Sequence, residues 1–325
     1  MILVTSAAGI VGHSLLRRLI SRGHSVRAFV KNEAQASALR AEGSVEIMTG
    51  DLQNPADIQQ SIDGVDQIYF AAPTRIVKEV PMVEYLIEAC RSQSPKQIIY
   101  HSVIHPEIKQ LPHHGEKLIA EGCFIDSGLP VTILRPSHYM QNYLEAWDFL
   151  RLGVFPFPIS AESRMGVVDI EDVSEAAVKI IENPGSHIGK TYDLSAVELN
   201  RNEMARICSR VFASEIKAIR IPPATINNPT LVLGEIGNIV KSLAKPKFFS
   251  LMKLIPILLR SRNPRGMRDW PEDARNCYHA MLEYYDMCGL PAGDLSHLPA
   301  LLGRKPTDFE GFIQREKALR KGGCS

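Results

Sequence analysis

The sequence lacks the features that would place it in several large classes of protein. It has six cysteines, but no two form a CxxC pair and none stands beside a histidine at zinc-finger spacing, so we expect no metal site. No apolar run is long enough for a transmembrane helix, which needs ~20 residues. The chain opens directly on a short apolar run at 1–5 without the basic region and cleavage site of a secretory signal. We therefore expect a cytoplasmic protein with reduced thiols.

The chain also lacks a strong net charge and an internal repeat. Lys and Arg number 37 against 36 Asp and Glu, which leaves a formal net charge of +1. No global electrostatic field favours nucleic acid or an acidic partner, so we expect no nucleic-acid binding. Hydrophobic residues make up 45% of the chain, an ordinary globular content, so disorder is not expected. A chain of 325 residues suits one large domain with a smaller one.

Short β-branched and apolar runs alternate with helical patterns over the first 195 residues. The expected strands are at 1–5, 25–31, 44–50, 65–71, 96–101, 131–135 and 191–194. The expected helices are at 10–22, 33–41, 76–91, 114–127, 139–151 and 170–182. This alternation predicts right-handed βαβ units, and therefore an α/β fold with a doubly wound parallel sheet of the Rossmann type.

The pattern changes after about residue 195. Asn200 and Glu203 form a capping-box signature at the start of a helix, and the chain beyond is mostly helical and rich in proline. We therefore expect a Rossmann domain at 1–195 and a smaller, mostly helical substrate-binding domain at 196–325, with 152–165 contributing to the smaller one.

A run of small residues follows the first expected strand and opens the first expected helix. Gly9 and Gly12 fit two of the glycine positions of a dinucleotide-binding turn, and Ser6 occupies the first. Such a turn lets the backbone approach a pyrophosphate and aims free helix N–H groups at the phosphates. The candidate cofactor contacts in this turn are Thr5, Ser6, Ala8, Gly9, Ile10, Val11 and Gly12.

The second expected strand ends in a cation. Lys31 stands where an NAD site usually has an acidic residue, and Arg27 lies on the same face of the strand by its two-residue period. A cation here favours a 2′-phosphate over a bare ribose, so the sequence predicts NADP(H) rather than NAD(H). A solvated basic strand end is the alternative interpretation.

Polar residues gather after the fifth expected strand. Ser102 ends that strand, and His113 and Lys117 lie one turn apart on one face of the helix that follows. At a helix N-terminus beside a lysine the imidazolium is disfavoured, so we expect a neutral His113 that polarises an oxygen by hydrogen bonding. The alternative is that His113 is a surface histidine. Surface histidines are expected at His101, His105 and His114.

The glycine spacing and the histidine–lysine pair together resemble the NmrA-like family of atypical short-chain dehydrogenases. The pattern S-x-x-G-x-x-G at 6–12 is similar to the G-x-x-G-x-x-G of extended and atypical members. His-x-x-x-Lys at 113–117 stands where most short-chain dehydrogenases carry Tyr-x-x-x-Lys, and NmrA-like members often carry the histidine. Further stretches that carry the resemblance are Leu134–Asn142, Asp169–Val173 and Leu302–Phe309.

The resemblance implies roles for these residues. Ser102 and His113 would bind the substrate oxygen, and Lys117 would contact the nicotinamide ribose. Asp51 and Leu52, after the third strand, would flank the adenine. The ribose would be lined by Ala71, Ala72, Pro73 and Thr74. After the sixth strand, the candidates are Pro136 and Asn142 for the cofactor and Tyr139 for catalysis.

The sequence thus favours an NADPH-dependent oxidoreductase that reduces a carbonyl or conjugated double bond of a small organic molecule. A bulky apolar substrate, of the quinone or secondary-metabolite type, is indicated by Phe155, Phe157, Phe248, Phe249 and Trp270. Two alternatives remain open because fold alone does not fix function. One is an NADP(H)-binding redox sensor without turnover, and the other is an isomerase or dehydratase on the same scaffold.

A basic and apolar stretch at 236–268 contains no acidic residue. Its apolar part is interrupted by Lys253 and Pro256 and is too short to span a bilayer. Contact of 241–268 with an anionic membrane surface, a lid over the substrate, a homodimer contact and ordinary packing all remain open.

Overall fold

The computed structural model describes residues 1–43, 45–225 and 269–322. The chain divides into two compact units, each assembled from three segments. The larger unit takes 1–137, 170–195 and 293–306, and the smaller takes 138–169, 196–292 and 307–325. The basic stretch 236–268, with Phe248 and Phe249, lies outside the described residues.

A seven-stranded parallel sheet forms the core of the larger unit, in the order β10-β6-β5-β4-β1-β2-β3. Its strands are β1 (Ile2–Val4), β2 (Val26–Val30), β3 (Glu46–Thr49), β4 (Gln67–Phe70), β5 (Gln97–His101), β6 (Val131–Pro136) and β10 (Thr191–Leu194). All residues of β1 and β5 are buried, as expected for strands covered on both faces. The predicted α/β fold and its seven strands are confirmed.

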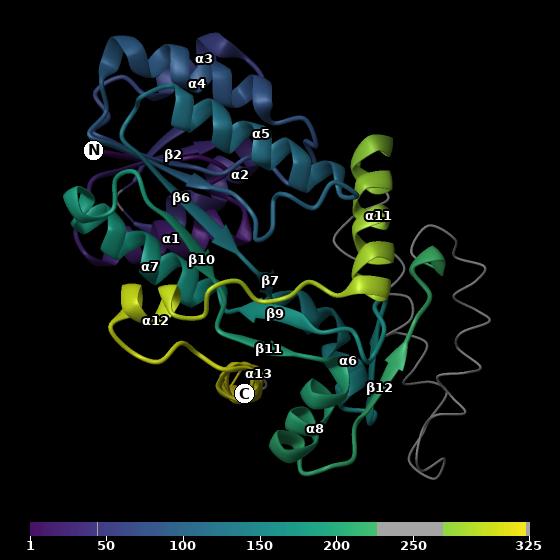
Figure 1. The fold of residues 1–325 in the computed structure, drawn as a ribbon. Helices are drawn as coiled ribbons and strands as arrows, with labels where there is room; N and C mark the ends of the chain where they lie inside the picture. Colours follow the sequence, from purple (N-terminus) through teal and green to yellow (C-terminus); the bar gives the residue numbers. More distant parts are fainter. Residues whose placement is uncertain (44, 226–268, 323–325) are drawn as a thin grey trace. The chain divides into compact units, whose positions relative to one another are not determined.

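Helices cover both faces of this sheet (Figure 1). On one face α1 (Ile10–Ser21) packs against α7 (Ile170–Glu182), and α12 (His297–Leu302) packs against α7. On the other face lie α3 (Pro55–Ser61), α4 (Val80–Gln93) and α5 (Pro112–Asp126), each packed against the next. The remaining helix of this unit, α2 (Glu33–Leu39), follows β2. Helix α4 begins at Val80 rather than at 76, because Pro81 suits the first turn, where its missing N–H is not needed.

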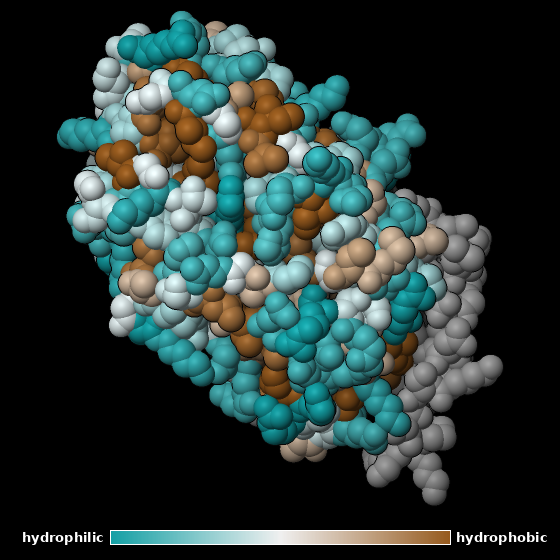
Figure 2. All heavy atoms as spheres, viewed as in Figure 1, coloured by the Kyte–Doolittle hydropathy of each residue, from teal (hydrophilic) through white to brown (hydrophobic). Residues whose placement is uncertain are grey.

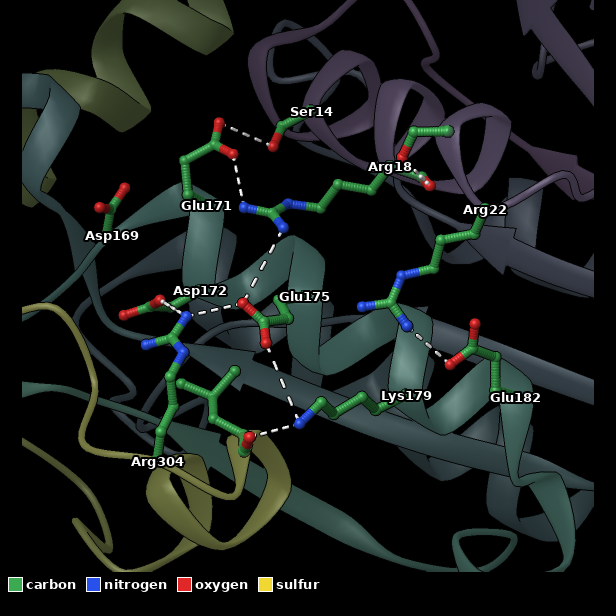
Figure 3. Close-up of polar contacts among 12 residues, drawn as sticks. Ser14, Arg18, Arg22, Asp169, Glu171, Asp172, Glu175, Lys179, Glu182 and Arg304 are labelled. Atoms are coloured by element: carbon green, nitrogen blue, oxygen red, sulfur yellow. Dashed lines mark hydrogen bonds and ion pairs between the residues drawn. The ribbon is translucent and has the colours of Figure 1, made fainter.

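Ion pairs tie α7 to α1 and to the segment after α12 (Figure 3). Arg18 of α1 donates to Glu171 at 2.7 Å, and Arg304 donates to Asp172 at 2.7 Å and to Glu175 at 2.6 Å. Asp172 is only 1% exposed, and removing the partner of so buried a carboxylate is strongly destabilising. Asp172 and Arg304 both belong to the stretches that carry the family resemblance, and their contacts here are structural.

The smaller unit contains two small sheets, of orders β11-β9-β7 and β12-β8. Their strands are β7 (His138–Tyr139), β8 (Val154–Phe157), β9 (Met165–Val168), β11 (Val197–Leu199) and β12 (Lys217–Arg220). Among the described residues of this unit, the helices are α6 (Trp147–Leu150), α8 (Arg201–Phe212), α11 (Glu272–Cys288) and α13 (Phe309–Gly322). The predicted helix over 139–151 is confirmed in part: Tyr139 belongs to β7, which pairs with β9, and the chain is then helical as a 3-10 stretch, Met140–Ala146, followed by the short α6.

The capping box of α8 is confirmed. The side chain of Asn200 accepts from the Glu203 N–H at 2.9 Å, and the Glu203 carboxylate accepts from the Asn200 N–H at 2.8 Å. The next residue, Arg201, is fully buried and donates to the carbonyls of Phe155, Ile159 and Ile219. Arg201 therefore fastens α8 to β8 and β12.

Aromatic residues fill the core of the smaller unit. Tyr143 contacts the rings of Phe155, Phe157 and Phe309, and all four side chains are buried. Trp270 is buried as well. These aromatic residues do not support the inference of a bulky substrate, because their apolar surface is used in packing.

Apolar side chains also reach the surface of the larger unit. Leu118, Ile119 and Ile125 of α5 are 43%, 55% and 65% exposed. Figure 2 shows apolar surface, in brown, over the part of this unit where α4 and α5 lie. In the part of the chain that the structure describes, no helix is long and apolar enough to cross a membrane.

Candidate functional site

The strand order of the large sheet reverses between β1 and β4. The carboxyl ends of these neighbouring strands therefore mark the point where doubly wound folds bind ligands. Thr5, directly after β1, accepts from the N–H of Ala71 at 2.8 Å and donates to its carbonyl at 2.9 Å. Ser6 donates to the same carbonyl at 2.8 Å. The two hydroxyl side chains thus hydrogen bond the Ala71 backbone and connect the ends of β1 and β4.

The turn between β1 and α1 leaves no room for larger residues. A Cβ atom on Gly12 would lie 2.4 Å from the Ser6 carbonyl oxygen, and one on Gly9 would lie 3.1 Å from it. Ser6 itself adopts a φ of 49°, and its carbonyl accepts from the Gly9 N–H at 2.8 Å. Gly12 is therefore required for the close packing of helix on turn that the sequence predicted.

The N-terminus of α1 is open to an anion. Its N-cap residue, Gly9, has no side chain with which to cap the helix, and the first turn contains no acidic residue. Unsatisfied N–H groups and the positive end of the helix dipole favour a phosphate at such a position. Among the predicted contacts in the turn, Gly9 and Ile10 are exposed, Ala8 and Val11 are half-buried, and Thr5 is buried.

Arg27 of β2 and Lys31, which directly follows this strand, have different surroundings. The Lys31 side chain is 66% exposed, and its ammonium group lies 3.8 Å from the carboxylate of Asp51. It can therefore reach an anion bound near the ends of β2 and β3. Arg27 donates to Glu46 at 2.6 Å and to the carbonyls of Ser61 and Asp63 at 2.7 Å, and it is only 12% exposed. The structure therefore places Lys31, but not Arg27, at the carboxyl edge of the sheet with a largely exposed side chain.

The ends of β3 and β4 lie along the same edge. The Asp51 N–H donates to Asp57 at 2.8 Å, and its carboxylate accepts from the N–H of Gln53 at 2.9 Å, which orders the turn. Leu52 is buried. After β4 the exposure rises from the buried Ala71 through the half-buried Ala72 and Pro73 to the exposed Thr74.

Lys117 lies in a buried cluster that the sequence did not reveal. Its ammonium group donates to both carboxylate oxygens of Glu79 at 2.9 Å and to the His101 carbonyl at 3.0 Å. The Tyr100 hydroxyl also donates to Glu79. Glu79 is fully buried and Lys117 is 5% exposed. The one local signal for Glu79 is that it precedes a helix at a position where glutamate is uncommon.

Ser102 lies in a second buried cluster. Its hydroxyl donates to Glu121, which also accepts from the guanidinium of Arg135, at 3.0 Å from its Nε. Ser102 and Glu121 are each 2% exposed. The single hydroxyl proton of Ser102 is used inside the protein, so in this arrangement the side chain does not donate to a substrate oxygen.

His113, at the second position of α5, is half-buried. Within the described residues its ring nitrogens have no hydrogen-bond partner, and its one ring neighbour is His114. Burial, with Lys117 and His114 nearby, lowers the pKa of His113 to about 3. This direction agrees with the neutral imidazole expected from the sequence, although burial rather than the lysine is the main cause of the lowered pKa.

Two of the three histidines predicted at the surface are buried, so that prediction is wrong for them. His101 hydrogen bonds the Tyr69 hydroxyl at 2.6 Å, and His114 donates from Nδ1 to the His105 carbonyl at 2.8 Å. Burial lowers the pKa of His101 to about 3 and that of His114 to about 4. Local polarity suggested exposure, but the neighbouring strand and the loop before α5 supply partners.

The remaining candidates divide between the two units. Pro136 ends β6 in the larger unit, and its carbonyl accepts from the Ile104 N–H at 3.0 Å. Tyr139 and Asn142 belong to the smaller unit. Tyr139 lies in β7, and burial raises the pKa of its hydroxyl, while Asn142 hydrogen bonds His138 at 3.1 Å.

Two hollows of the larger unit lie away from these residues. One of about 330 Å³ is lined in part by Met1, Asp66 and Lys96, and one of about 360 Å³ by His187 and His297 among others. Neither contains a predicted site residue. In the described ranges no group of three or more His, Cys, Asp or Glu side chains is placed to hold a metal ion.

Comparison with known proteins gives consistent matches. The model of the NmrA-like family matches residues 1–257. Quinone oxidoreductase 2 of Escherichia coli is 27% identical over 240 residues, 68% of this chain and 83% of that protein. An NAD(P)H azoreductase of Xenophilus azovorans is 26% identical over 224 residues, 68% and 77% of the two chains. The structure of Citrobacter sp. triphenylmethane reductase complexed with NADP(H) has a similar fold, with a TM-score of 0.73 at 20% identity over 96% and 99% of the two chains.

Proposed function

The chain belongs to the NmrA-like family, and on that premise we propose that it is an NADPH-dependent reductase of a conjugated organic acceptor. The observation that carries the proposal is the turn at 5–12. It combines an uncapped helix N-terminus with a glycine that cannot bear a side chain, at the point where the strand order reverses. This combination fits a dinucleotide pyrophosphate.

The acceptor class is suggested by what three similar proteins share in their names. One reduces a quinone, one an azo compound and one a triphenylmethane compound. All three compounds are conjugated systems that take up electrons readily. We propose that the present chain reduces an acceptor of this kind and oxidises NADPH.

Different residues of the larger unit would bind the cofactor and the acceptor. The turn from Ser6 to Gly12 would hold the pyrophosphate, and Lys31 would bind the 2′-phosphate. The cofactor supplies the hydride when bound. The neutral imidazole of His113 would donate a hydrogen bond to the acceptor atom on which charge builds, as neutral histidines do elsewhere. Arg27 and Ser102 are left out of this assignment, because both are bound to neighbouring protein groups.

Reversing the charge of Lys31 should remove the preference for NADPH. In Lys31→Glu we expect the dissociation constant for NADPH to rise about 10- to 100-fold, because a charge-assisted hydrogen bond is replaced by repulsion. The dissociation constant for NADH should change less than about threefold. Fluorescence titration with both cofactors measures this. Lys190→Glu, at the opposite edge of the sheet, is the control, and equal losses for the two cofactors would contradict the assignment.

Removing the ring nitrogens of His113 should affect turnover rather than cofactor binding. In His113→Phe we expect kcat to fall about 100-fold, the usual effect of losing one donor to a developing charge. The dissociation constant for NADPH should stay within about threefold. Steady-state kinetics with a quinone acceptor measures the first quantity and titration the second. His24→Phe, which removes a histidine bonded to Glu182, is the control, and an unchanged kcat in His113→Phe would refute the role.

A second candidate is an NADP(H)-binding regulator without turnover. One observation favours it, namely that the polar atoms of Ser102 and Lys117 are both used in internal clusters. An isomerase or dehydratase would turn over its substrate without net consumption of the cofactor. Titration with NADPH and NADH, followed by a quinone, azo, enone and aldehyde panel read by cofactor oxidation, separates the three. A homodimer stays a prediction, which sedimentation tests.

A further inference from the structure

Glu79 has an unusual position for a carboxylate. It directly precedes α4, yet its side chain makes no capping hydrogen bond to that helix, and it is fully buried. N-cap positions usually carry Ser, Thr, Asp or Asn, whose side chains accept from the first N–H groups of the helix. The Glu79 carboxylate instead turns to Lys117 of α5 and Tyr100 of β5.

The ammonium group of Lys117 has no donor left for a ligand. Its contacts are the two oxygens of Glu79, both at 2.9 Å, and the His101 carbonyl at 3.0 Å. It also lies 5.1 Å from the centre of the Tyr100 ring. An ammonium has three N–H donors, so these contacts use all of them. A direct bond to the nicotinamide ribose, which the resemblance implied, would require breaking one of them.

Building on the proposed function, we propose that Glu79 is a positioning residue that holds Lys117 as a buried cation beside His113. Lys117 then acts on the site through its charge rather than through a bond to the cofactor. His113 lies one turn before Lys117 on the same helix, and residues at this spacing are neighbours on the helix surface.

The charge of Lys117 depends on Glu79. A buried ammonium without a counter-charge is strongly disfavoured and gives up its proton near neutral pH. The other charged or titratable groups around the cluster are Tyr100, His101, Glu116, Glu121 and His114. Glu116 and Glu121 act on Tyr100, and the Glu116 carboxylate lies 3.5 Å from the Val80 N–H. Of these three carboxylates, Glu79 alone accepts from the ammonium group.

The test is the pH dependence of turnover in Glu79→Gln, which keeps the shape of the side chain and removes its charge. At about pH 8 we expect kcat to fall about tenfold or more, with recovery at lower pH as Lys117 regains its proton. The KM for NADPH should stay within about threefold. Glu79→Asp, which restores the charge, should recover most of kcat. The double variant Glu79→Gln/Lys117→Met should be no slower than Lys117→Met alone.

Asp172→Asn is the matched control, because it also neutralises a buried, paired carboxylate, and it should lower Tm with kcat unchanged. The proposal is wrong if Glu79→Gln lowers Tm but keeps its kcat at every pH. It is also wrong if the losses of kcat in Glu79→Gln and Lys117→Met add in the double variant. If the wild-type protein does not oxidise NADPH at all, the proposed function fails instead. The Glu79 assignment is then judged by the NMR signal of the Lys117 ammonium, which should be lost at about pH 8 in Glu79→Gln and kept in the wild type.

Discussion

Gly12→Val is expected to abolish binding of NADPH, with an affinity loss of more than ~100-fold, or about 2.7 kcal/mol. The first atom of any side chain at this position would lie 2.4 Å from the Ser6 carbonyl oxygen and 3.0 Å from the Ala7 Cα. Backbone atoms cannot rotate away, so the turn itself must move. The N–H groups that would hold the pyrophosphate move with it. Fluorescence titration of the folded variant with NADPH measures the loss.

The matched control is Gly122→Val in α5, where an added Cβ meets no atom within 4 Å. This variant should bind NADPH as the wild type does. Gly12→Ala provides a milder version of the same clash if Gly12→Val does not fold. Wild-type affinity in a folded Gly12→Ala, shown by an unchanged far-ultraviolet circular dichroism spectrum, would mean that the turn does not hold the cofactor.

Acid should destabilise the protein strongly, because two histidines are buried in their neutral form. The pKa of His101 is lowered to about 3 and that of His114 to about 4. As pH falls below about 6.5, the unfolded chain binds protons that the folded protein cannot. Stability present above that pH is therefore lost as pH falls towards these lowered values. Each histidine should remove about 2 kcal/mol from the free energy of unfolding by about pH 5.

Urea denaturation at a series of pH values tests this expectation. His101→Gln and His114→Gln should each make the free energy of unfolding less dependent on pH between about pH 6.5 and 5. His24→Gln, which removes a histidine bonded to Glu182 at the surface, is the control. A free energy of unfolding that stays level down to about pH 5 in the wild type would show that these histidines accept protons in the folded protein.

The large sheet could be predicted because its signals are local. Each of its strands is a short apolar run, and the helices between them are long enough to keep an amphipathic period. The exceptions have physical reasons. Residues 139–151 carry a helical pattern of apolar residues, but pairing of β7 with β9 draws 138–139 into a sheet. This pairing depends on β9, which begins some 27 residues after the start of β7. No local sequence pattern indicates such a distant partner.

The candidate site was predicted in part. The places of Gly9, Gly12 and Lys31 in the fold could be predicted, because the geometry of a turn and the end of a strand restrict which residues occur there. The hydrogen-bond partners of Arg27, Ser102 and Lys117 could not be predicted, because each partner lies on another element of the fold. Glu46, Glu121 and Glu79 look like ordinary surface residues in the sequence. They become informative only when the neighbouring strands and helices are assembled around them.

The proposed reduction is tested most directly by a single turnover. The protein, in excess over NADPH, is mixed rapidly with a quinone, and the near-ultraviolet absorbance of the reduced nicotinamide is followed. We expect complete loss of this absorbance in one phase, one quinone reduced for each NADPH consumed, and a rate about 100-fold lower in His113→Phe. If NADPH binds tightly yet its absorbance persists with quinone, azo and triphenylmethane acceptors alike, the chain is not the reductase proposed here.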